Sequence, residues 1–481
     1  MKRLSFLLCL VLSGCGSEST PQAYPNPQSI ENKDVTESKG VENTKVENTK
    51  PAVTSSPSTG STGPSQTIKH AEIGTGTGVT SSGRGMTTEE NPSVNPIRTT
   101  NFLSSSDSHT LEVYNGKVYS WGNDGLWLGR KGKNSVPKTE TAYSNMNFVA
   151  TSEKQSFAVN TDGELLVWPL FDSLRRLSIS YPTVHAKTSH LKIASVALGP
   201  DFSAVITTGG DLYTWGKGQY GKLGHLYDSD WKQLSVRELE DIFYTGEMDR
   251  DKPTCVQYLK NKDIKVASVE LGAHHAAAVS TDGRLFTWGD GRNGKLGHGN
   301  NQSQPVPKEV EYFTKIKKAD GRIVSAVSLG AEMAAAVISD GGLYIWGTQF
   351  ETPPEGGHER PVKKWMTPQF ISYFGNNVAS VTLKGRFAAV ITNDRKLYTR
   401  SWTADFHGLL GRSKSKQDES GWGLVEFPDK AIRIEAISIG SDYVIARSED
   451  GRIYAWGKGS DRLGLGPDVV DIDTPRQLTR E

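Results

Sequence analysis

Residues 266–289 read Val-Ala-Ser-Val-Glu-Leu-Gly-Ala-His-His-Ala-Ala-Ala-Val-Ser-Thr-Asp-Gly-Arg-Leu-Phe-Thr-Trp-Gly, and residues 290–299 continue Asp-Gly-Arg-Asn-Gly-Lys-Leu-Gly-His-Gly. A second copy runs from Ile193 through Leu212-Tyr-Thr-Trp-Gly216 to Gly221-Lys-Leu-Gly-His225. Five partial copies end at Val118-Tyr-Ser-Trp-Gly122, Leu165-Leu-Val-Trp168, Leu343-Tyr-Ile-Trp-Gly347, Leu397-Tyr-Thr-Arg400 and Ile453-Tyr-Ala-Trp-Gly457. A fixed repeat of this length predicts an array in which each unit buries a face against the next.

Each repeat predicts four short antiparallel strands. The first strand is small and β-branched, as in Val266-Ala-Ser-Val269, and an apolar strand such as Ala276-Ala-Ala-Val279 follows a Gly-containing turn. A two-residue hairpin then leads into the third strand, because Asp-Gly and Asn-Gly tolerate the positive φ of tight turns. These dipeptides are Asn115-Gly116, Asp162-Gly163, Asp282-Gly283, Asp340-Gly341 and Asp450-Gly451. A Pro-containing segment such as Pro305-Val-Pro307 suits an outer edge strand. The prediction is an all-β, seven-bladed β-propeller of four-stranded antiparallel blades.

The pattern Gly-x-x-His…Asp-Gly-x-Leu-Tyr-x-Trp-Gly-x-Gly-x-x-Gly-x-Leu-Gly-His resembles the repeat of the regulator of chromosome condensation (RCC1) family, whose fold is a seven-bladed propeller. The resemblance covers residues 97–481. Two copies match it nearly throughout and the others are partial. Among these, the second loses everything after Trp168, the fifth lacks the Leu-Gly-His tail after Gly347, and the sixth has Arg400 for the tryptophan. The tail Thr474-Pro-Arg-Gln-Leu478 looks like a strand that opens a repeat, and we expect it to complete the first blade and close the ring.

The first hundred residues differ in composition from the repeats. Met1-Lys-Arg3, the apolar run from Leu4 to Leu12 and the sequence Leu12-Ser-Gly-Cys15 resemble a bacterial lipoprotein signal, with 1–14 as signal peptide and Cys15 as the lipidated residue. An ordinary secretory signal is the alternative. Gly16, rather than aspartate, after the cysteine favours the outer membrane of the cell envelope. Residues 15–96 are rich in Ser, Thr, Pro and Asn, and such a segment predicts a disordered tether.

Charge and cysteine content restrict the classes of function. Lysine and arginine total 55 against 54 acidic residues, so no basic stripe predicts a nucleic-acid partner. No later apolar run has the length of a transmembrane helix. Of three cysteines, Cys9 belongs to the signal and Cys255 is left alone, which we interpret as a small buried residue.

Several motifs that could suggest chemistry have a structural explanation. His109 and His275 share one repeat position, and His225 and His298 share another, so they are spread around the ring and predict structural hydrogen bonding rather than zinc binding. The Gly-rich loops after Gly216 and Gly289 run from strand to strand, whereas a phosphate-binding loop leads into a helix. No metal, cofactor or catalytic constellation is predicted.

Residues that interrupt the repeat are better candidates for binding. An insertion at about 226–252 lengthens the third unit, and its apolar residues have roughly helical spacing, which favours a helix packed on the ring. Alternatively, its aromatic residues project as a contact surface, since aromatic residues are enriched at interaction hot spots. The candidate binding residues, in the insertion and other loops, are Trp127, Tyr220, Tyr227, Trp231, Tyr244, Phe350, Phe406 and Trp422.

These features favour a monomeric, membrane-anchored, non-catalytic scaffold that recognises a protein or a glycan outside the cytoplasm through loops on a propeller face. One alternative is an inhibitor of an exported enzyme, because a secreted β-lactamase inhibitor is similar in its seven repeats and its aromatic loops. Another is an enzyme acting on polysaccharide or peptide at the central channel. The founding member of the resembled family is a guanine nucleotide exchange factor for a nuclear GTPase, and an exported lipoprotein does not meet such a GTPase. The sequence does not identify the partner or the face that binds it.

Overall fold

The computed structural model describes residues 102–123, 127–130, 135–139, 144–171, 177–179, 182–226, 242, 248–351, 360–402, 408–412 and 421–481. The predicted signal peptide with Cys15 and the predicted tether lie outside these residues.

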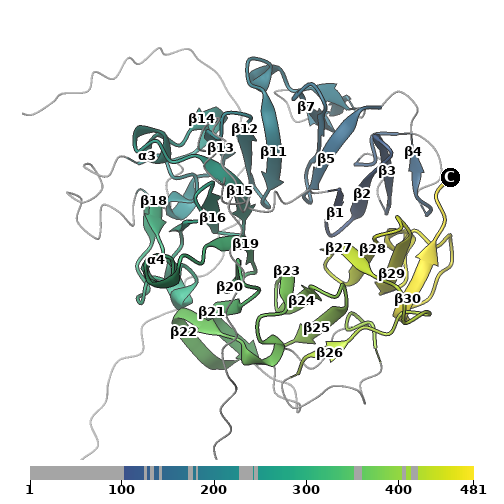
Figure 1. Cartoon of the computed structure of the whole chain (residues 1–481). Coiled ribbons are helices and arrows are strands. Elements are labelled where there is room, and N and C mark those ends of the chain that lie inside the picture. The colour runs from purple at the N-terminus through teal and green to yellow at the C-terminus, as the bar shows by residue number, and fades with distance from the viewer. Residues whose placement is uncertain are drawn as a thin grey trace, which may run out of the picture. The chain divides into compact units, whose positions relative to one another are not determined.

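Seven four-stranded antiparallel sheets are arranged around a central channel, which confirms the predicted seven-bladed β-propeller (Figure 1). The first three blades are β1 (Leu103–Ser105), β2 (His109–Tyr114), β3 (Lys117–Gly122) and β4 (Lys138–Thr139); β5 (Met146–Thr151), β6 (Ser156–Asn160), β7 (Leu165–Trp168) and β10 (Thr183–Val184); and β11 (Ile193–Leu198), β12 (Phe202–Thr207), β13 (Leu212–Gly216) and β14 (Arg250–Cys255). The fourth and fifth are β15 (Val266–Leu271), β16 (His275–Ser280), β17 (Leu285–Gly289) and β18 (Gln304–Glu309); and β19 (Val324–Leu329), β20 (Met333–Ile338), β21 (Leu343–Glu351) and β22 (Arg360–Phe370). The last two are β23 (Val378–Lys384), β24 (Phe387–Thr392), β25 (Leu397–Ser401) and β26 (Gly423–Leu424); and β27 (Ile434–Ile439), β28 (Tyr443–Ser448), β29 (Ile453–Gly457) and β30 (Ile472–Leu478).

Additional elements lie in the connections. The pair β8 (Leu170–Phe171) and β9 (Leu177–Ile179) stands between β7 and β10. The helices α3 (Gln257–Asn261) and α4 (Glu311–Asp320) each connect consecutive blades. Short 3-10 helices occupy Ala186–Thr188, Gln219–Gly221, Arg292–Gly294, Ser372–Phe374 and Asp461–Leu463. Among the described residues, no helix has the length and apolar character needed to cross a membrane.

Small side chains on the inner strands allow the blades to pack closely. Ala276, Ala277 and Ala278 of β16 have no exposed surface, because neighbouring blades cover both faces of the sheet. The predicted hairpins join the second and third strands; Gly341, for example, has φ +88° and a Cβ there would lie 2.3 Å from the carbonyl oxygen of Asn376. Cys255 is buried at the end of β14, as expected from the sequence.

A tryptophan on the third strand links most blades to the preceding one. Its indole Nε1 donates a hydrogen bond of 2.7–3.0 Å to a backbone carbonyl in the third-to-fourth-strand connection of that blade. The donor and acceptor pairs are Trp121 and Arg462, Trp168 and Trp127, Trp288 and Lys222, Trp346 and Lys295, and Trp456 and Leu409. The glycine two residues after each acceptor has a positive φ and lies against the indole, which explains the Leu-Gly of the repeat tail.

Where a repeat lacks its tail, the indole hydrogen bond between that blade and the next is replaced by another contact or lost. The second blade lacks the tail, and Trp215 of the third blade packs instead on His185 and Phe157, at ring distances of 5.8 and 6.2 Å. The fifth blade also lacks the tail, and in the sixth Arg400 replaces the tryptophan. Where one blade lacks the Leu-Gly tail, the next blade either has no tryptophan on its third strand or has one that makes a different contact.

The ring does not close by strand exchange. We expected the segment ending at Leu478 to complete the first blade, but β30 pairs with β29 in the last blade, so that prediction is wrong. Side chains close the ring instead. Arg480 binds the buried carboxylate of Glu112 with two hydrogen bonds of 2.8 and 2.6 Å, and the Tyr443 hydroxyl donates to the carbonyl oxygen of Ser106 at 2.9 Å.

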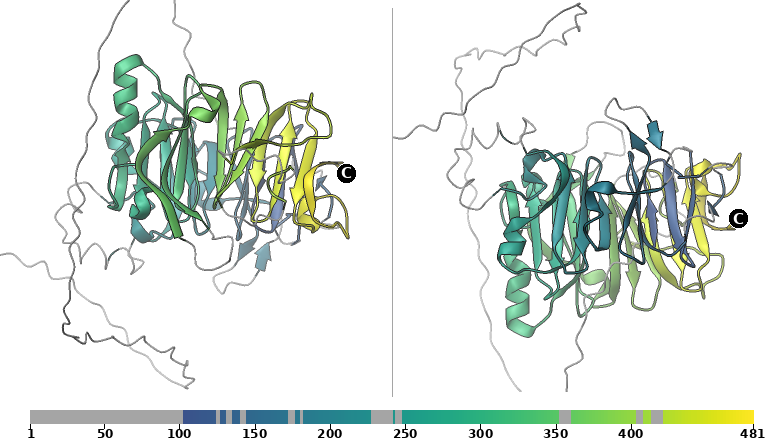
Figure 2. Two further views of the ribbon diagram at one scale, coloured as in Figure 1. Left: turned by 90° about the horizontal axis from the view of Figure 1, so that it is seen from below. Right: turned by 90° about the horizontal axis from the view of Figure 1, so that it is seen from above.

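The antiparallel order gives the ring two different faces. One, here called the loop face, carries the turns between first and second strands and the connections between third and fourth strands. The other, the base face, carries the short hairpins and the connections between blades, including α4. In side view, α4 and the β8–β9 pair lie on opposite sides of the ring, as this topology requires (Figure 2).

Candidate functional site at the channel mouth

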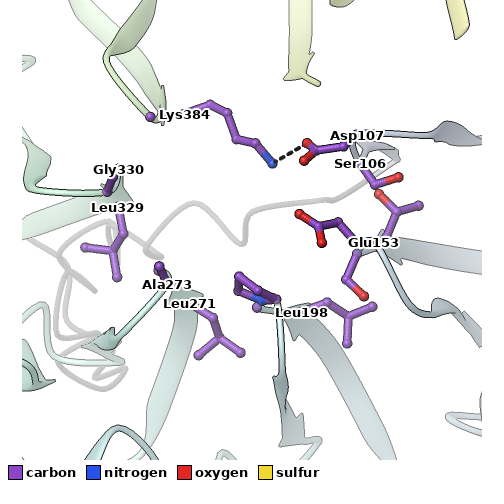
Figure 3. Close-up of a pocket in the computed structure, with 16 residues that line it drawn as sticks. Ser106, Asp107, Glu153, Leu198, Leu271, Ala273, Leu329, Gly330 and Lys384 are labelled. Atoms are coloured by element: carbon purple, nitrogen blue, oxygen red, sulfur yellow. Dashed lines mark ion pairs between the residues drawn. The ribbon is translucent and has the colours of Figure 1, made fainter. Parts of the chain in front are cut away.

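On the loop face, the mouth of the central channel forms a cavity of about 250 Å³ (Figure 3). Turns that follow the innermost strands of six blades line it, and the strands that carry these turns are β1, β5, β11, β15, β19 and β23. Because innermost strands converge on the propeller axis, residues more than 200 positions apart in sequence meet here. In sequence, the inserted and irregular segments stand between third and fourth strands whose adjoining ends are on this face.

The charged groups of the cavity come from three blades. Lys384 Nζ lies 3.5 Å from Asp107 Oδ1, and the two side chains are 46% and 40% exposed. An ion pair this exposed contributes about 0–1 kcal/mol. Glu153 stands beside the pair (Figure 3). A hydrogen bond with Asp107, followed by burial and the charge of Asp107, raises the pKa of Glu153, while the charge of Lys384 opposes the shift. Two carboxylates therefore share a single nearby ammonium group.

The part of the cavity wall formed by the third, fourth and fifth blades is apolar. Leu198, Leu271 and Leu329 end the inner strands of three consecutive blades, and each is followed by a glycine and then by proline or alanine. The corresponding position in the second blade is Thr151, so the repeat places hydroxyl and carboxylate groups on one side and aliphatic groups on the other.

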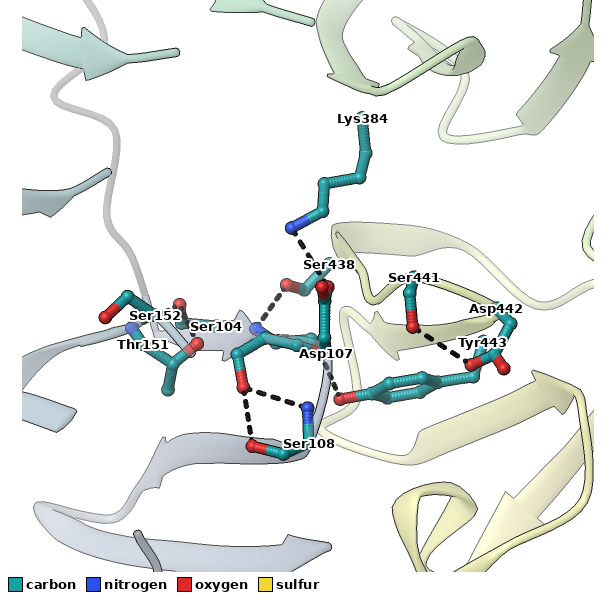
Figure 4. Close-up of polar contacts among 12 residues, drawn as sticks. Ser104, Asp107, Ser108, Thr151, Ser152, Lys384, Ser438, Ser441, Asp442 and Tyr443 are labelled. Carbon is teal, nitrogen blue, oxygen red and sulfur yellow. Dashed lines mark hydrogen bonds and ion pairs between the residues drawn. The ribbon is translucent and has the colours of Figure 1, made fainter. Parts of the chain in front are cut away.

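A network of hydroxyl groups fixes the turn that carries Asp107 (Figure 4). Ser104 Oγ and Thr151 Oγ1 lie 3.0 Å apart, and the Ser105 amide donates to Ser438 Oγ at 2.7 Å. The Tyr443 hydroxyl is fully buried, and burial raises its pKa, so it remains a neutral donor. Contacts to both neighbouring blades hold the Asp107 turn in place.

The structure places two of the predicted binding residues in contacts between blades rather than in the cavity. Trp127 is half-buried and stacks on His109 with ring centroids 6.5 Å apart, and its carbonyl accepts the indole hydrogen bond of Trp168. Tyr220 is half-buried and contacts His274 and Arg292 of the fourth blade, at 5.5 and 4.7 Å from its ring centroid.

Trp422 is not a projecting loop residue. It is 1% exposed and packs against Phe374 at 5.1 Å, so burial removes it from the candidate contact surface. Phe350 lies in strand β21. Tyr227, Trp231, Tyr244 and Phe406 lie outside the described residues, as does most of the predicted insertion.

Sequence reasoning missed Asp107, Glu153 and Lys384. The available signal was a departure from the repeat at the first turn. The turn between the first and second strands is counted here from the last leucine or isoleucine of the first strand. The second residue of this turn is glycine in four blades, namely Gly199, Gly272, Gly330 and Gly440. Lys384 stands at that position in the sixth blade. Only the ring geometry shows that these departures face one another.

The histidines and glycine-rich loops are largely structural, as predicted. His225 Nε2 and His298 Nε2 lie 2.9 and 3.0 Å from threonine hydroxyls of their own blades, and His109 Nε2 lies 2.7 Å from Ser156 Oγ. His275 is the exception, because neither of its buried ring nitrogens has a hydrogen-bond partner. The described residues contain no group of three or more His, Cys, Asp or Glu side chains that could hold a metal ion.

The lysines of the glycine-rich loops are already paired. Lys222 Nζ lies 2.6 Å from Asp201 Oδ1, and Lys295 Nζ lies 3.0 Å from Asp290 and 2.8 Å from Glu332. Both lysines are buried. Their charges thus stabilise the loops, which agrees with the interpretation of these segments as turns.

Comparison with known families agrees with the repeat read from the sequence. Residues 209–279 and 282–337 match the model of the regulator of chromosome condensation (RCC1) repeat, and residues 193–222 and 266–295 match a second model of the same repeat. These matches lie between residues 193 and 337 and show what this part of the chain is similar to. They fall in the third, fourth and fifth blades, of which the third and fourth have the most complete copies of the pattern.

Similar proteins extend the resemblance over most of the ring. The E3 ubiquitin-protein ligase HERC2 of Homo sapiens is 28% identical over 392 residues, which cover 76% of this chain but only 7% of HERC2. The ultraviolet-B receptor UVR8 of Arabidopsis thaliana is 27% identical over 395 residues, which cover 79% of this chain and 82% of UVR8. The crystal structure of human WBSCR16 has a TM-score of 0.56 at 17% identity, covering 76% of this chain and 94% of its own, and shows the same fold.

Proposed function

We propose that this protein is a non-catalytic binding scaffold that holds a partner protein on the loop face of its propeller. The observation that carries the proposal is the channel-mouth cavity, in which charged, hydroxyl and aliphatic groups from six blades converge. Concave sites with a few convergent polar groups are the usual places for recognition. The described connections between third and fourth strands, such as residues 290–303 and 458–471, lie on the same face.

The side chains that line the cavity fit a protein partner better than a glycan. The side chains that line the cavity are small, aliphatic or charged, and none of them is aromatic. Sugar rings are commonly held by stacking on aromatic faces, whereas a protein loop can satisfy both a charged and an aliphatic wall. Sequences similar to this chain also occur in proteins as different as a ubiquitin ligase and an ultraviolet-B receptor, which is typical of a fold used as a platform.

The site of action in the proposal is the bacterial cell envelope. The basic start, the apolar run to Leu12 and the Ser-Gly-Cys15 sequence support lipid attachment at Cys15, and the following Ser/Thr/Pro-rich residues support a tether. A monomer on such a tether would meet partners in the periplasm or at the cell surface.

The experiment is capture of partners from detergent-solubilised envelope with the full chain, followed by titration of the purified partner. Ala331 is exposed in the cavity wall, and Ala331→Arg would block the mouth. Ala319 is exposed on α4 of the base face, so Ala319→Arg is the matched control. We expect Ala331→Arg to weaken the partner at least about tenfold and Ala319→Arg to leave it unchanged.

Other outcomes would change the proposal. Equal binding by both variants would rule out the loop face. A captured exported enzyme that is inhibited at nanomolar concentration would make the scaffold an inhibitor. Binding on a glycan array but not to protein would identify the partner as a glycan instead of a protein. Turnover of envelope polysaccharide or peptide that Asp107→Asn abolishes would show that the protein is an enzyme and not a scaffold.

A further inference from the structure

We infer that the channel-mouth cavity receives a single basic side chain of the partner, an arginine in preference to a lysine. This inference rests on the proposed function and specifies the chemistry of the partner at the same site. Three features support it, namely the charge of the cavity, a poorly satisfied carboxylate oxygen and the apolar part of the wall.

The charge balance of the cavity favours a cation. Asp107, Glu153 and Lys384 are the only charged side chains among its described lining residues, so two carboxylates face one ammonium group. The Asp107–Lys384 pair is weak because both side chains are nearly half exposed. A second cation entering between the carboxylates would reduce their repulsion without displacing a strong contact.

One carboxylate oxygen in the cavity wall is poorly satisfied. Asp107 Oδ1 makes no hydrogen bond, and Lys384 Nζ is 3.5 Å from it. The contact between the Glu153 and Asp107 carboxyl groups is a hydrogen bond only while Glu153 holds a proton. When Glu153 is ionised, a donor from the partner would supply the missing hydrogen bond. Guanidinium donates several hydrogen bonds in one plane and can bridge two carboxylates, whereas an ammonium group acts as a point charge.

The size and the apolar wall fit one long side chain. The cavity of about 250 Å³ lies below the range of about 300–1,000 Å³ that is usual for small-molecule sites. Leu271 and Leu329 lie across the cavity from Asp107, and Leu198 lies beside Glu153 (Figure 3). These leucines can cover the methylene groups of an arginine whose charged end reaches Asp107 and Glu153.

The test uses two peptides that differ only in charge, acetyl-Gly-Leu-Arg-Leu-Gly-amide and the same peptide with citrulline in place of arginine. Isothermal titration of the full chain at low salt should give millimolar affinity for the arginine peptide and at least about tenfold weaker binding of the citrulline peptide. Equal binding of the two peptides, or no binding of either at about 10 mM, would overturn the inference.

Variants of the protein locate the site. Asp107→Asn and Glu153→Gln should each weaken the binding of the arginine peptide about tenfold, since each removes a charged acceptor for the guanidinium group. Lys384→Met should strengthen it, because the competing cation is removed. Asp263→Asn changes a 90% exposed carboxylate that follows α3 on the base face and should have no effect. Equal effects of Asp263→Asn and Asp107→Asn would assign the binding to net charge and overturn the inference, and thermal melts check that each variant folds.

The two proposals can fail separately. Arginine-peptide binding together with an Ala331→Arg variant that retains its protein partner would reject the loop-face scaffold and leave the cation site standing. A partner lost by Ala331→Arg, but indifferent to Asp107→Asn and to replacement of its own arginines and lysines, would reject the cation site alone.

Discussion

The indole nitrogen of Trp346 donates a 2.9 Å hydrogen bond to the backbone carbonyl of Lys295 in the preceding blade. The contact requires Gly297, whose φ is +77° and where a Cβ would lie 2.9 Å from that same nitrogen. One hydrogen bond thus connects two features of the repeat, Trp on the third strand and Leu-Gly in the tail, that lie in different blades.

Gly297→Ala should destabilise the propeller more than Gly299→Ala. Both glycines have φ near +80°, so both substitutions carry a similar backbone cost of about 1–2 kcal/mol. A Cβ at Gly299 meets only Thr367 Cγ2 at 3.7 Å, whereas at Gly297 it crowds the indole of Trp346. We expect an additional loss of about 1–3 kcal/mol for Gly297→Ala, measured by urea unfolding. Equal losses would mean that the indole contact can shift without cost.

Trp346→Phe should cost more stability than Trp215→Phe. The first substitution leaves the Lys295 carbonyl without its donor, which adds about 1–3 kcal/mol to the change in packing. Trp215 is the matched control because, among the described residues, its indole nitrogen makes no such bond between blades. Thermal or urea unfolding of both variants gives the comparison, and a larger loss for Trp215→Phe would contradict it.

Arg480→Met should remove the contact that joins the last residues of the chain to the first blade and should lower the stability of the ring. Glu112 has no exposed surface, and burial raises its pKa while Arg480 opposes the shift. Removing the arginine leaves a buried carboxylate without its main partner, a loss of about 3–5 kcal/mol. Adding Glu112→Gln should restore part of this stability, and Arg476→Met, at an exposed position of β30, should change little. Failure of the double variant to recover would indicate that Arg480 acts through packing alone.

The free energy of unfolding should fall as the pH is lowered from about 6.5 to 4. Burial lowers the pKa of His109 and His275 to about 3 and of His225 and His298 to about 4, from an ordinary value of 6.5. The unfolded chain therefore binds protons that the folded protein does not, and each histidine contributes a loss of up to about 1.4 kcal/mol per pH unit. Urea unfolding across this range measures the total.

His275→Phe should flatten this pH dependence by the share of one histidine. Phe202 and Phe387 occupy the same position in the third and sixth blades, so the ring accepts phenylalanine there. His190→Gln, at an exposed position, is the control and should leave the slope unchanged. An unchanged slope in His275→Phe would mean that this imidazole is protonated in the folded protein.

The repeat determined the blade count, the four strands of each blade and the hairpins between second and third strands. These features are local: Asp-Gly turns, Leu-Tyr-x-Trp strands and small second strands lie within about 35 residues of one another, so a single copy contains the information. The structural role of His225 and His298 could be predicted for the same reason, because each binds a threonine eleven residues away in its own blade.

Only the tertiary structure decided how the ring closes and what meets at its centre. β30 stays in its own blade, and closure depends on Arg480 reaching Glu112, 368 residues away. Trp422 is buried because the sixth blade packs aromatic residues where its repeat has lost the tryptophan. Asp107, Glu153 and Lys384 face one another because inner strands converge on one axis, a relationship between blades that no single repeat contains.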